Sequence, residues 1–300
     1  MKKFLPFMSG AYSTAPGLTA LSRSADTPKA LDIDENYFSY LENKEDCRRE
    51  DITKYHCVYE FGEKTRSAVI RCLTEHMTSE YPEVFQRRGD FLTNLKTGES
   101  ISLDDTRTPD LKYISVFDAL CSQLQEDVAV VQLNGEKDWL TAIHLCSPNH
   151  WDPRTKIGKP FNEIHTPVPG IERTVKNYQV MLKMIIDKEP FTRFAWGIAT
   201  DTQLNHHPEV PPGKNAGEWS GRRMDDEASE LYVRTERQNL IGLSSANAFI
   251  FTIRTYFYKV SELEESERRS LATAINSMTD ETLTYKGMTG MKDWVLRTIA

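Results

Sequence analysis

The sequence has 300 residues, 37 of them basic and 44 acidic, and therefore a formal net charge of −7. This negative balance argues against a nucleic-acid-binding protein, because such proteins usually present a basic face to the phosphates. No apolar run reaches the roughly 18–20 residues that a membrane-spanning helix needs. The length allows one large domain or two ordinary ones, at about 150 residues per domain.

The first ten residues resemble a signal peptide only in part. Lys2 and Lys3 precede apolar residues, but Pro6, Ser9 and Gly10 interrupt the apolar stretch. It is therefore shorter than the roughly 7–15 residues of a signal-peptide core. We expect this segment to belong to the folded protein.

Five cysteines are scattered along the chain, which is not typical of a disulfide framework. No two of them have C-x-x-C spacing, and the sequence has no glycine-rich nucleotide motif. An iron–sulfur cluster, a zinc ribbon and a nucleotide site are therefore not predicted in this chain. Free cysteines suit a reducing compartment, so a cytoplasmic location is predicted. Cys146 is able in principle to ligate a metal, but a lone buried cysteine is more often inert packing, which is the expectation here.

The first half of the chain predicts an extended arm followed by helices. Residues 1–30 are rich in Ser, Thr, Ala, Gly and Pro, and we expect them to lie over the surface. Apolar residues at helical spacing predict a helix through residues 69–77 and another through 116–124. Between these helices, residues 91–95 and 100–103 flank Lys-Thr-Gly-Glu, a weak hairpin pattern.

The second half predicts strands. Residues 128–133 and 139–146 are strand-like and flank Asn134-Gly135, the strongest short hairpin pattern, for which a type I′ turn is expected. Farther along, the pattern predicts a helix over 171–185, strands over 191–200, 231–240 and 248–258, and a long polar loop over 201–229. Ser261-x-x-Glu264 predicts a capping box that opens a helix, and residues 291–295 a last short helix.

These elements predict an α+β fold in a single domain. Its parts are an N-terminal arm with helices over residues 1–127, a core of five antiparallel strands over 128–260, and C-terminal helices over 261–300.

His165 is the leading candidate for a ligand or base. It stands between Ile164 and Thr166-Pro167, and the prolines of this segment restrict its backbone. The alternative is a structural histidine satisfied by the backbone. His144 and His150 are weaker candidates, and His206-His207 is expected on the surface.

A charged run lies inside the predicted strand over 231–240. Alternation places Arg234, Glu236 and Gln238 on one face and Arg237 on the other. This pattern fits a solvated face with ion pairs, in which Arg254 of the next strand pairs with Glu236. It also fits a clamp for carboxylates, to which arginine is well suited. Trp139, Trp151, Trp196 and Phe251 are expected in the core.

A set of short motifs, in order and at consistent spacing, resembles one family. They are Leu5-Pro6-Phe7, Asp34-x-x-Tyr37, Gln125-Glu126-Asp127, Pro148-x-x-Trp151, Lys156-x-Gly158, Ile164-His165-x-Pro167-Val168-Pro169, Arg193-x-x-Trp196, Arg234-x-Glu236-Arg237-Gln238-x-Leu240 and Phe251-Thr-Ile-Arg-Thr-Tyr256. Over roughly residues 4–260 the chain resembles the haem-dependent oxidative N-demethylase alpha-subunit-like family.

The resemblance implies a PAS-like core that binds haem b. It implies that the protein removes a methyl group from a small alkylamine such as dimethylamine, using O₂ and releasing formaldehyde. Electrons would come from NADPH through separate flavin and iron–sulfur subunits. His165 would be the metal ligand on the proximal side of the haem, and Arg234, Arg237 and Arg254 would bind the propionates. Glu236 would hold the alkylammonium, and Trp196 would offer a π face to it.

One position departs from the family pattern, which reads Arg-x-Asn-Trp where this chain has Arg193-Phe194-Ala195-Trp196. If the missing asparagine orients substrate or oxygen, this protein takes another substrate or lacks demethylase activity. Two further hypotheses remain open at this point. One is a haem-binding sensor or carrier without turnover, and the other is an interaction module without haem.

Overall fold

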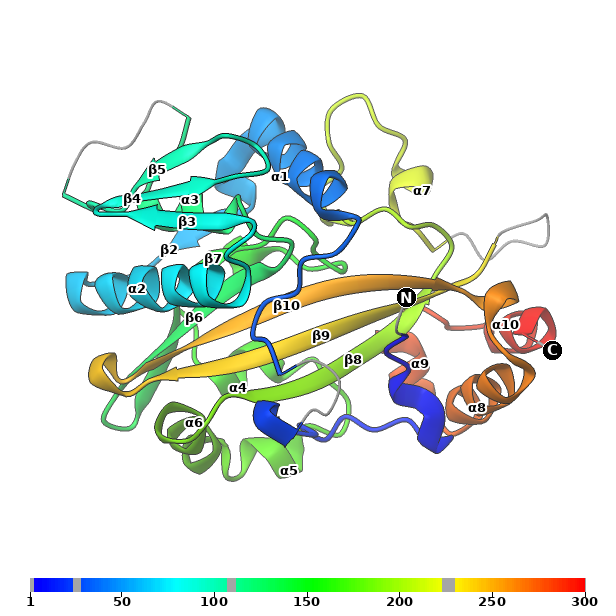
Figure 1. Cartoon of the computed structure of the whole chain (residues 1–300). Helices are drawn as coiled ribbons and strands as arrows, with labels where there is room; N and C mark the ends of the chain where they lie inside the picture. Colours follow the sequence, from blue (N-terminus) through cyan, green and yellow to red (C-terminus); the bar gives the residue numbers. More distant parts are fainter. Residues whose placement is uncertain (1–2, 24–27, 107–111, 223–229, 300) are drawn as a thin grey trace.

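A seven-stranded antiparallel sheet forms the centre of the molecule in the computed structural model, which describes residues 3–23, 28–106, 112–222 and 230–299 (Figure 1). Its strand order is β1-β8-β9-β10-β6-β7-β2. The strands of this sheet are β1 (Thr19–Ala20), β2 (His56–Val58), β6 (Asp127–Asn134), β7 (Lys137–His144), β8 (Phe191–Ala199), β9 (Tyr232–Leu243) and β10 (Ala248–Lys259).

The five strands predicted from the sequence are confirmed as β6 to β10, and they are adjacent and antiparallel. The predicted β6–β7 hairpin is also confirmed. Its turn is different, because Asn134 pairs with Lys137 and the central residues are Gly135 and Glu136. Of these two only Gly135 has a positive φ, so the type I′ prediction was wrong.

The sheet is wider than predicted. β1 and β2 come from the N-terminal region and add a strand at each edge, so the sheet extends beyond residues 128–260. A second sheet consists of β3 (Phe85–Arg88), β4 (Phe91–Asn94) and β5 (Ser100–Ser102). The weak hairpin pattern is confirmed as β4–β5, and β3 was not predicted.

Most predicted helices are present, with two corrections. The single helix expected over 171–185 is two helices, α5 and α6. The capping box of α8 uses Glu264 and Glu267 rather than Ser261 and Glu264, because the chain first makes a 3-10 turn over Val260–Glu262. The helices are α1 (Tyr37–Asp51), α2 (Glu63–Glu80), α3 (Val116–Cys121), α4 (Phe161–His165), α5 (Glu172–Val175), α6 (Tyr178–Asp187), α7 (Ala216–Trp219), α8 (Glu265–Asn276), α9 (Asp280–Tyr285) and α10 (Lys292–Ile299). The other 3-10 helices are Pro6–Ser9, Leu21–Arg23, Ile52–Lys54, Pro153–Thr155 and Ser244–Ala246.

Helices cover both faces of the large sheet (Figure 1). On one side, Ile241 of β9 and Ile250 of β10 pack with Leu73 of α2. On the other, Leu240 of β9 packs with Leu182 of α6. We call these sides the α2 face and the α6 face. On β9 the α2 face carries Val233, Thr235, Arg237, Asn239 and Ile241, and the α6 face carries Arg234, Glu236, Gln238, Leu240 and Gly242.

Gly242 sets the distance between β9 and α6. A Cβ at this position would lie 2.3 Å from the carbonyl oxygen of Ile186 and 2.6 Å from that of Ile185. Since backbone atoms cannot move aside as a flexible side chain can, only glycine fits here.

The N-terminal arm lies over the surface for most of its described length, as expected, but Phe7 anchors it in the core. Phe7 is 0% exposed and packs edge-on against Trp196, with 5.5 Å between ring centroids. The same apolar cluster contains Leu271 of α8 and Ile299 of α10. Burial of this aromatic side chain outweighs the polar composition of the arm.

His206 and His207 are also buried, at 2% and 0% exposure, so the prediction of a surface position was wrong. The polar loop folds back over the sheet edge, and His206 forms a bridge with Asn149. Residues 223–229 of the predicted loop lie outside the described residues. Among the described residues, no helix combines the length and apolar character of a membrane span.

Candidate functional site

The six site residues predicted from the sequence divide between the two faces of the sheet. Arg234 and Glu236 lie on the α6 face, as does His165 at the end of α4, whose neighbour Ile164 packs against that face. Arg237 and Arg254 are cross-strand partners on the α2 face, and Trp196 joins them there, opposite Thr235. The sheet therefore separates two groups that the sequence placed in one site.

His165 is oriented for ligation. Its Nδ1–H donates to the carbonyl oxygen of Phe161, 2.8 Å away and one helical turn earlier. The ring also stacks on the Phe161 ring, with 4.0 Å between centroids. Burial lowers the pKa of His165 to about 4, so the imidazole is neutral at physiological pH. With Nδ1 bound to a carbonyl, the lone pair is on Nε2, as in histidines that ligate metals.

Arg193 of β8 is a cation on the same face. It lies opposite Gln238 in the β8–β9 register and is close enough to His165 to affect its pKa. Its Nε is buried without a hydrogen-bond partner, and within the described residues its guanidinium makes no ion pair. Burial lowers the pKa of Arg193, with Glu236 as the main opposing influence. An unpaired buried guanidinium is costly unless an anion satisfies it.

Glu236 is the carboxylate of this site. Its Oε2 accepts a hydrogen bond from Gln238 at 2.9 Å, and its Oε1 lies 3.8 Å from Nε of Arg234. The side chain keeps 16% of its surface accessible. Its cross-strand neighbours are Ala195 on β8 and Thr255 on β10, so the side chains on both sides of it are small.

Two more cations reach the site from distant parts of the chain. Lys286, just after α9, donates to the carbonyl oxygen of Trp196 at 2.7 Å, and burial lowers its pKa to about 8. Burial and the charge of Arg234 lower the pKa of Arg222 to about 10. Charges of the site act on both residues: Glu236 partly offsets the lowering of the Lys286 pKa, and Arg234 contributes to the lowering of the Arg222 pKa.

The side chains of His165, Arg193 and Lys286 are surrounded by protein, which lowers their pKa values, and yet each keeps accessible surface. Each of these three side chains therefore remains within reach of a ligand. We call this group, with Arg222 and Glu236, the α6-face site. Among the described residues its three cations, Arg193, Arg222 and Lys286, exceed its one carboxylate by two charges, so it suits a ligand with two negative groups.

Arg234, on the same face, differs from Arg193 because backbone carbonyl groups occupy its guanidinium. Its Nη2 donates to the carbonyl oxygen of Ser147 at 2.7 Å, and its Nη1 to that of Leu204 at 3.1 Å. These bonds tie the polar loop to the end of β7. The guanidinium is 3% exposed, so its role in the structure is to hold the wall of the site.

On the α2 face the predicted residues have structural partners. Arg254 Nη2 pairs with Asp34 at 2.8 Å, and not with Glu236 as the sequence suggested, because the two lie on opposite faces. Arg237 donates to the carbonyl oxygen of Lys29 at 2.5 Å. Trp196 is 7% exposed and lies in the apolar cluster around Phe7.

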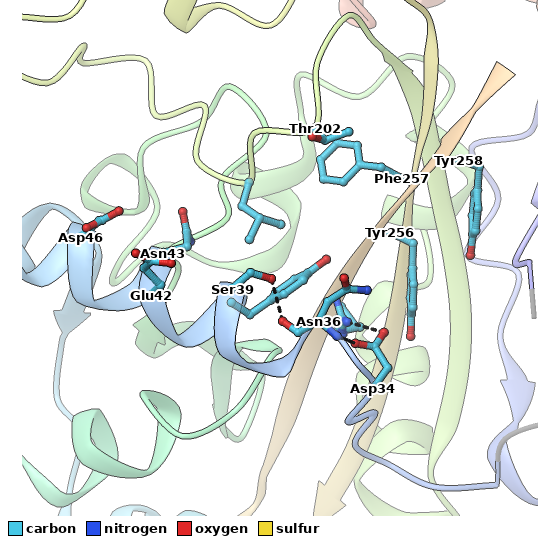
Figure 2. Close-up of a pocket in the computed structure, with 13 residues that line it drawn as sticks. Asp34, Asn36, Ser39, Glu42, Asn43, Asp46, Thr202, Tyr256, Phe257 and Tyr258 are labelled. Atoms are coloured by element: carbon cyan, nitrogen blue, oxygen red, sulfur yellow. Dashed lines mark hydrogen bonds and ion pairs between the residues drawn. The ribbon is translucent and has the colours of Figure 1, made fainter. Parts of the chain in front are cut away.

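A hollow of about 520 Å³ opens on the α2 side, between α1, β10 and the loop at Thr202 (Figure 2). Asp34, Glu42 and Asp46 contribute carboxylates to its lining. Figure 2 shows Asp34 at its base, where it pairs with the lining residue Arg254. This hollow is lined by acids and has its one lining arginine already paired, so it does not suit an anionic ligand.

His150 and His206 form a second group of histidines near Arg234. Their rings stack with 5.4 Å between centroids, and His150 has a positive φ of 63°. Burial and nearby cations, Arg222 first, lower the pKa of His150 to about 3. His206 Nε2 lies 3.1 Å from Asp201.

A sequence model described as "Haem-dependent oxidative N-demethylase, alpha subunit-like" matches residues 22–296, nearly the whole chain. The chain belongs to this family. The family description points to an oxidoreductase that uses haem and works with other subunits. The α6-face site of this N-demethylase-like chain fits such a cofactor, because it combines an imidazole with a free Nε2 and an arginine whose Nε lacks a partner.

Sequence reasoning did not assign Arg193, Arg222 or Lys286 to the site. Arg193 stood in the quoted motif Arg193-x-x-Trp196, and strand alternation places it on the face of Ala195 and thus of Glu236. Strand alternation therefore indicated that Arg193 belongs to the site. The sequence has no comparable pattern for Arg222 and Lys286, because they approach the sheet from a loop and from the C-terminal helices.

Proposed function

We propose that this chain is the haem-carrying subunit of an oxidative N-demethylase that acts on a small alkylamine such as dimethylamine. The observation that supports this most directly is the orientation of His165. Its Nδ1–H bond to Phe161 leaves Nε2 without a partner among the described residues, on a sheet face that also carries unpaired cations. A haem iron needs the first feature, and the two haem propionates need the second.

In this proposal His165 holds the haem iron through Nε2. Arg193 and Arg222 bind the propionates, and Arg234 fixes the wall behind them. When bound, haem supplies the iron that activates oxygen for oxidation of the methyl group. Because Arg237 and Arg254 lie across the sheet, we propose that they support the site only through the N-terminal segment that they anchor.

Glu236 binds and orients the amine. Its carboxylate is accessible and has Ala195 as a small neighbour, so an alkylammonium can approach it. The ion pair holds the nitrogen, and the small side chain of Ala195 leaves space for its methyl groups. Lys286 lies close enough to Glu236 for their charges to interact, and its pKa of about 8 keeps it a proton donor near neutral pH.

The electrons come from other subunits in this proposal. The family description contains the words "alpha subunit-like", which supports a partner chain. The sequence has neither a nucleotide motif nor a C-x-x-C pair. We propose that flavin and iron–sulfur subunits carry electrons from NADPH, in the cytoplasm, and that the sheet core is PAS-like.

An absorption spectrum tests haem binding. After reconstitution with haem b, we expect a Soret band for the wild type. His165→Gly should shift or lose this band, and added imidazole should restore it by occupying the vacated position. His150→Gly is the matched control and should keep the wild-type spectrum. An unchanged spectrum in His165→Gly would remove His165 from the proposal.

A formaldehyde assay separates the enzyme from a sensor or carrier. The reconstituted protein is incubated with O₂, a chemical or enzymatic reductant and a panel of methylated amines. We expect formaldehyde in proportion to amine consumed, and strongly reduced turnover in Glu236→Gln with an intact Soret band. A haem-loaded protein that yields no formaldehyde with any amine would support the sensor or carrier instead.

A further inference from the structure

A second group of ligating side chains lies at the point where β6 begins and β7 ends, and its histidine, His144, is on the α2 face, across the sheet from His165. Asp127, His144 and Cys146 each direct one ligand atom into the group, and these atoms all lie within 4.8 Å of one another. The three residues are 1%, 0% and 0% exposed. The sequence predicted nothing here, because Cys146 was considered alone.

His144 has the hydrogen-bonding partner typical of a metal ligand. Its Nε2 lies 3.1 Å from Oδ1 of Asp118. Arg48 donates a hydrogen bond from each of its two Nη atoms to the same carboxylate. Because Asp118 is held as a carboxylate, it accepts the proton of Nε2–H, and the lone pair of His144 is on Nδ1. That atom faces the Sγ of Cys146 at 3.8 Å. A carboxylate that orients an imidazole in this way is common around zinc.

The backbone orients Asp127. Its Oδ1 accepts from the amide of Cys146 and its Oδ2 from the amide of Ser147, both at 2.8 Å. Each carboxylate oxygen accepts more than one partner, so either can also bind a cation. These two bonds place the carboxylate before any ligand arrives.

Cys47 of α1 contacts Cys146 and is a candidate for a fourth position, outside the group whose ligand atoms all lie within 4.8 Å of one another. Its thiol is close enough to hydrogen bond with the thiol of Cys146, and its Sγ lies 3.6 Å from the carbonyl oxygen of the same residue. The amide of Asn205 donates to this sulfur at 3.4 Å. Cys47 is 1% exposed.

We propose that Nδ1 of His144, Sγ of Cys146, a carboxylate oxygen of Asp127 and Sγ of Cys47 bind a structural Zn²⁺ ion. Tetrahedral zinc has bonds of about 2.3 Å to sulfur and about 2.0 Å to nitrogen, which separates the two ligand atoms by roughly 3.5 Å. The 3.8 Å between Nδ1 and Sγ needs only a small adjustment to reach this value. The mixture of sulfur, nitrogen and oxygen ligands favours zinc over calcium or magnesium.

The charges around the group balance when zinc is bound. Lys44 is 2% exposed, and its ammonium donates to the carbonyl oxygens of Cys121 and Glu126. The Lys44 ammonium and a Zn²⁺ ion together bring three positive charges to the buried group. Asp127 and the two thiolates bring three negative ones. Binding of the ion therefore releases two protons to solvent and leaves the net charge unchanged.

A catalytic Cys–His–Asp triad is the other chemistry that Cys146, His144 and Asp118 suggest. A nucleophile must meet its substrate, and none of these three side chains has accessible surface. A closed structural zinc site has no such requirement. Zinc would join α1 to the ends of the central hairpin. This inference stands independently of haem in the α6-face site.

Metal analysis of the purified full-length protein tests the site. Zinc and iron are counted separately by mass spectrometry, after expression with added zinc and purification without chelators. We expect about one zinc per chain in the wild type, whatever the iron content. Cys146→Ser should lose most of it, whereas the matched buried cysteine variant Cys121→Ser should keep it. A wild type that holds no zinc, and takes up none from stoichiometric ZnCl₂, would overturn the proposal.

X-ray absorption at the zinc edge on the wild type avoids dependence on a variant that fails to fold. We expect sulfur scatterers at about 2.3 Å together with nitrogen or oxygen near 2.0 Å. Zinc surrounded only by nitrogen and oxygen would overturn the assignment of Cys146. Haem iron does not contribute at this edge, so the result does not depend on whether the protein binds haem or demethylates amines.

Discussion

Ala195 and Glu236 lie directly opposite each other on the neighbouring strands β8 and β9, with both side chains on the α6 face. Ala195 keeps part of its surface accessible, and so does Glu236. Residue 195, where the family resemblance implies an asparagine, is thus beside the one carboxylate that the described residues contribute to the candidate site. The size of residue 195 therefore sets the space in which an amine held by Glu236 can carry its alkyl groups.

We expect Ala195→Asn to narrow substrate choice. The larger side chain fills space beside Glu236, so diethylamine should lose more kcat/KM than dimethylamine does. A methylene-sized difference in a pocket gives roughly 10–200-fold discrimination, so a tenfold gain in selectivity for dimethylamine is a reasonable expectation. Formaldehyde or acetaldehyde release at several amine concentrations measures it.

Ala195→Ser controls for polarity with little added volume and should leave the selectivity near that of the wild type. Equal loss of both amines in Ala195→Asn would mean that residue 195 does not border the alkyl groups.

Arg193→Gln should weaken haem binding without unfolding the protein. A lost charge-assisted hydrogen bond costs roughly 1.5–3 kcal/mol, which is about a 10–100-fold rise in the haem dissociation constant. Arg193→Lys keeps the charge but not the two-pronged geometry, so an intermediate value is expected. Absorbance titration with haem measures all three proteins. Arg71→Gln, on an exposed position of α2, is the control, and an equal affinity for Arg193→Gln and wild type would contradict the role.

Strand alternation explains how much of the site the sequence could predict. It placed Arg234 and Glu236 on one face and Arg237 on the other, as the structure has them. It could not say which face His165 covers, because that depends on where the Pro-rich segment crosses the sheet. Arg222 and Lys286 reach the site only after the chain has folded back from far along the sequence, and a periodic pattern carries no information on that.

His76→Gln should reduce stability in a pH-dependent manner. His76 Nδ1 lies 2.7 Å from Oε1 of Glu80. Burial lowers the pKa of His76, but bonds with Cys72 and Glu80 outweigh it and raise the pKa to about 10. The folded-state pKa is therefore above the unfolded value of about 6.5, and the stabilisation is complete below that pH. It declines as the pH rises towards 10.

Urea unfolding of wild type and His76→Gln at several pH values measures this. We expect a difference of about 1 kcal/mol at pH 6, as for a partly exposed ion pair, and almost none at pH 10. A difference that grows with pH would contradict the charged pair. Glu80 also accepts hydrogen bonds from the backbone amides of Ala30 and Leu31. Loss of the His76–Glu80 pair should therefore also weaken the attachment of the segment around Ala30.

Phe7→Ala should destabilise the whole protein, although Phe7 is only the seventh residue of the sequence. The ring is 0% exposed, and removal of a buried phenylalanine costs about 3–5 kcal/mol. Denaturant unfolding followed by tryptophan fluorescence is suitable, because Trp196 is in contact with Phe7. Phe38→Ala, whose ring position is 57% exposed, should change the midpoint little. A surface arm would give equal results for the two variants.

The burial of Phe7 and the burial of His206-His207 escaped prediction for the same physical reason. Composition reports the average polarity of a segment, whereas burial is decided by single side chains and their partners. Phe7 is one apolar residue among polar ones, and His207 is buried because the loop packs against Tyr55, 5.5 Å from it between ring centroids. The hairpin of β6 and β7 was predictable because both its pattern and its contacts are local.

The cluster around Trp196 joins residues from opposite ends of the sequence, with Phe7 from one and Val295 and Ile299 from the other. Contacts between such distant residues require the closure of a very long loop, and they form slowly compared with hairpins and helices. The central strands can therefore pair before this cluster closes. The wall of the α6-face site that carries Lys286 is then among the last parts to reach its native arrangement, and cofactor capture would be a late event in folding.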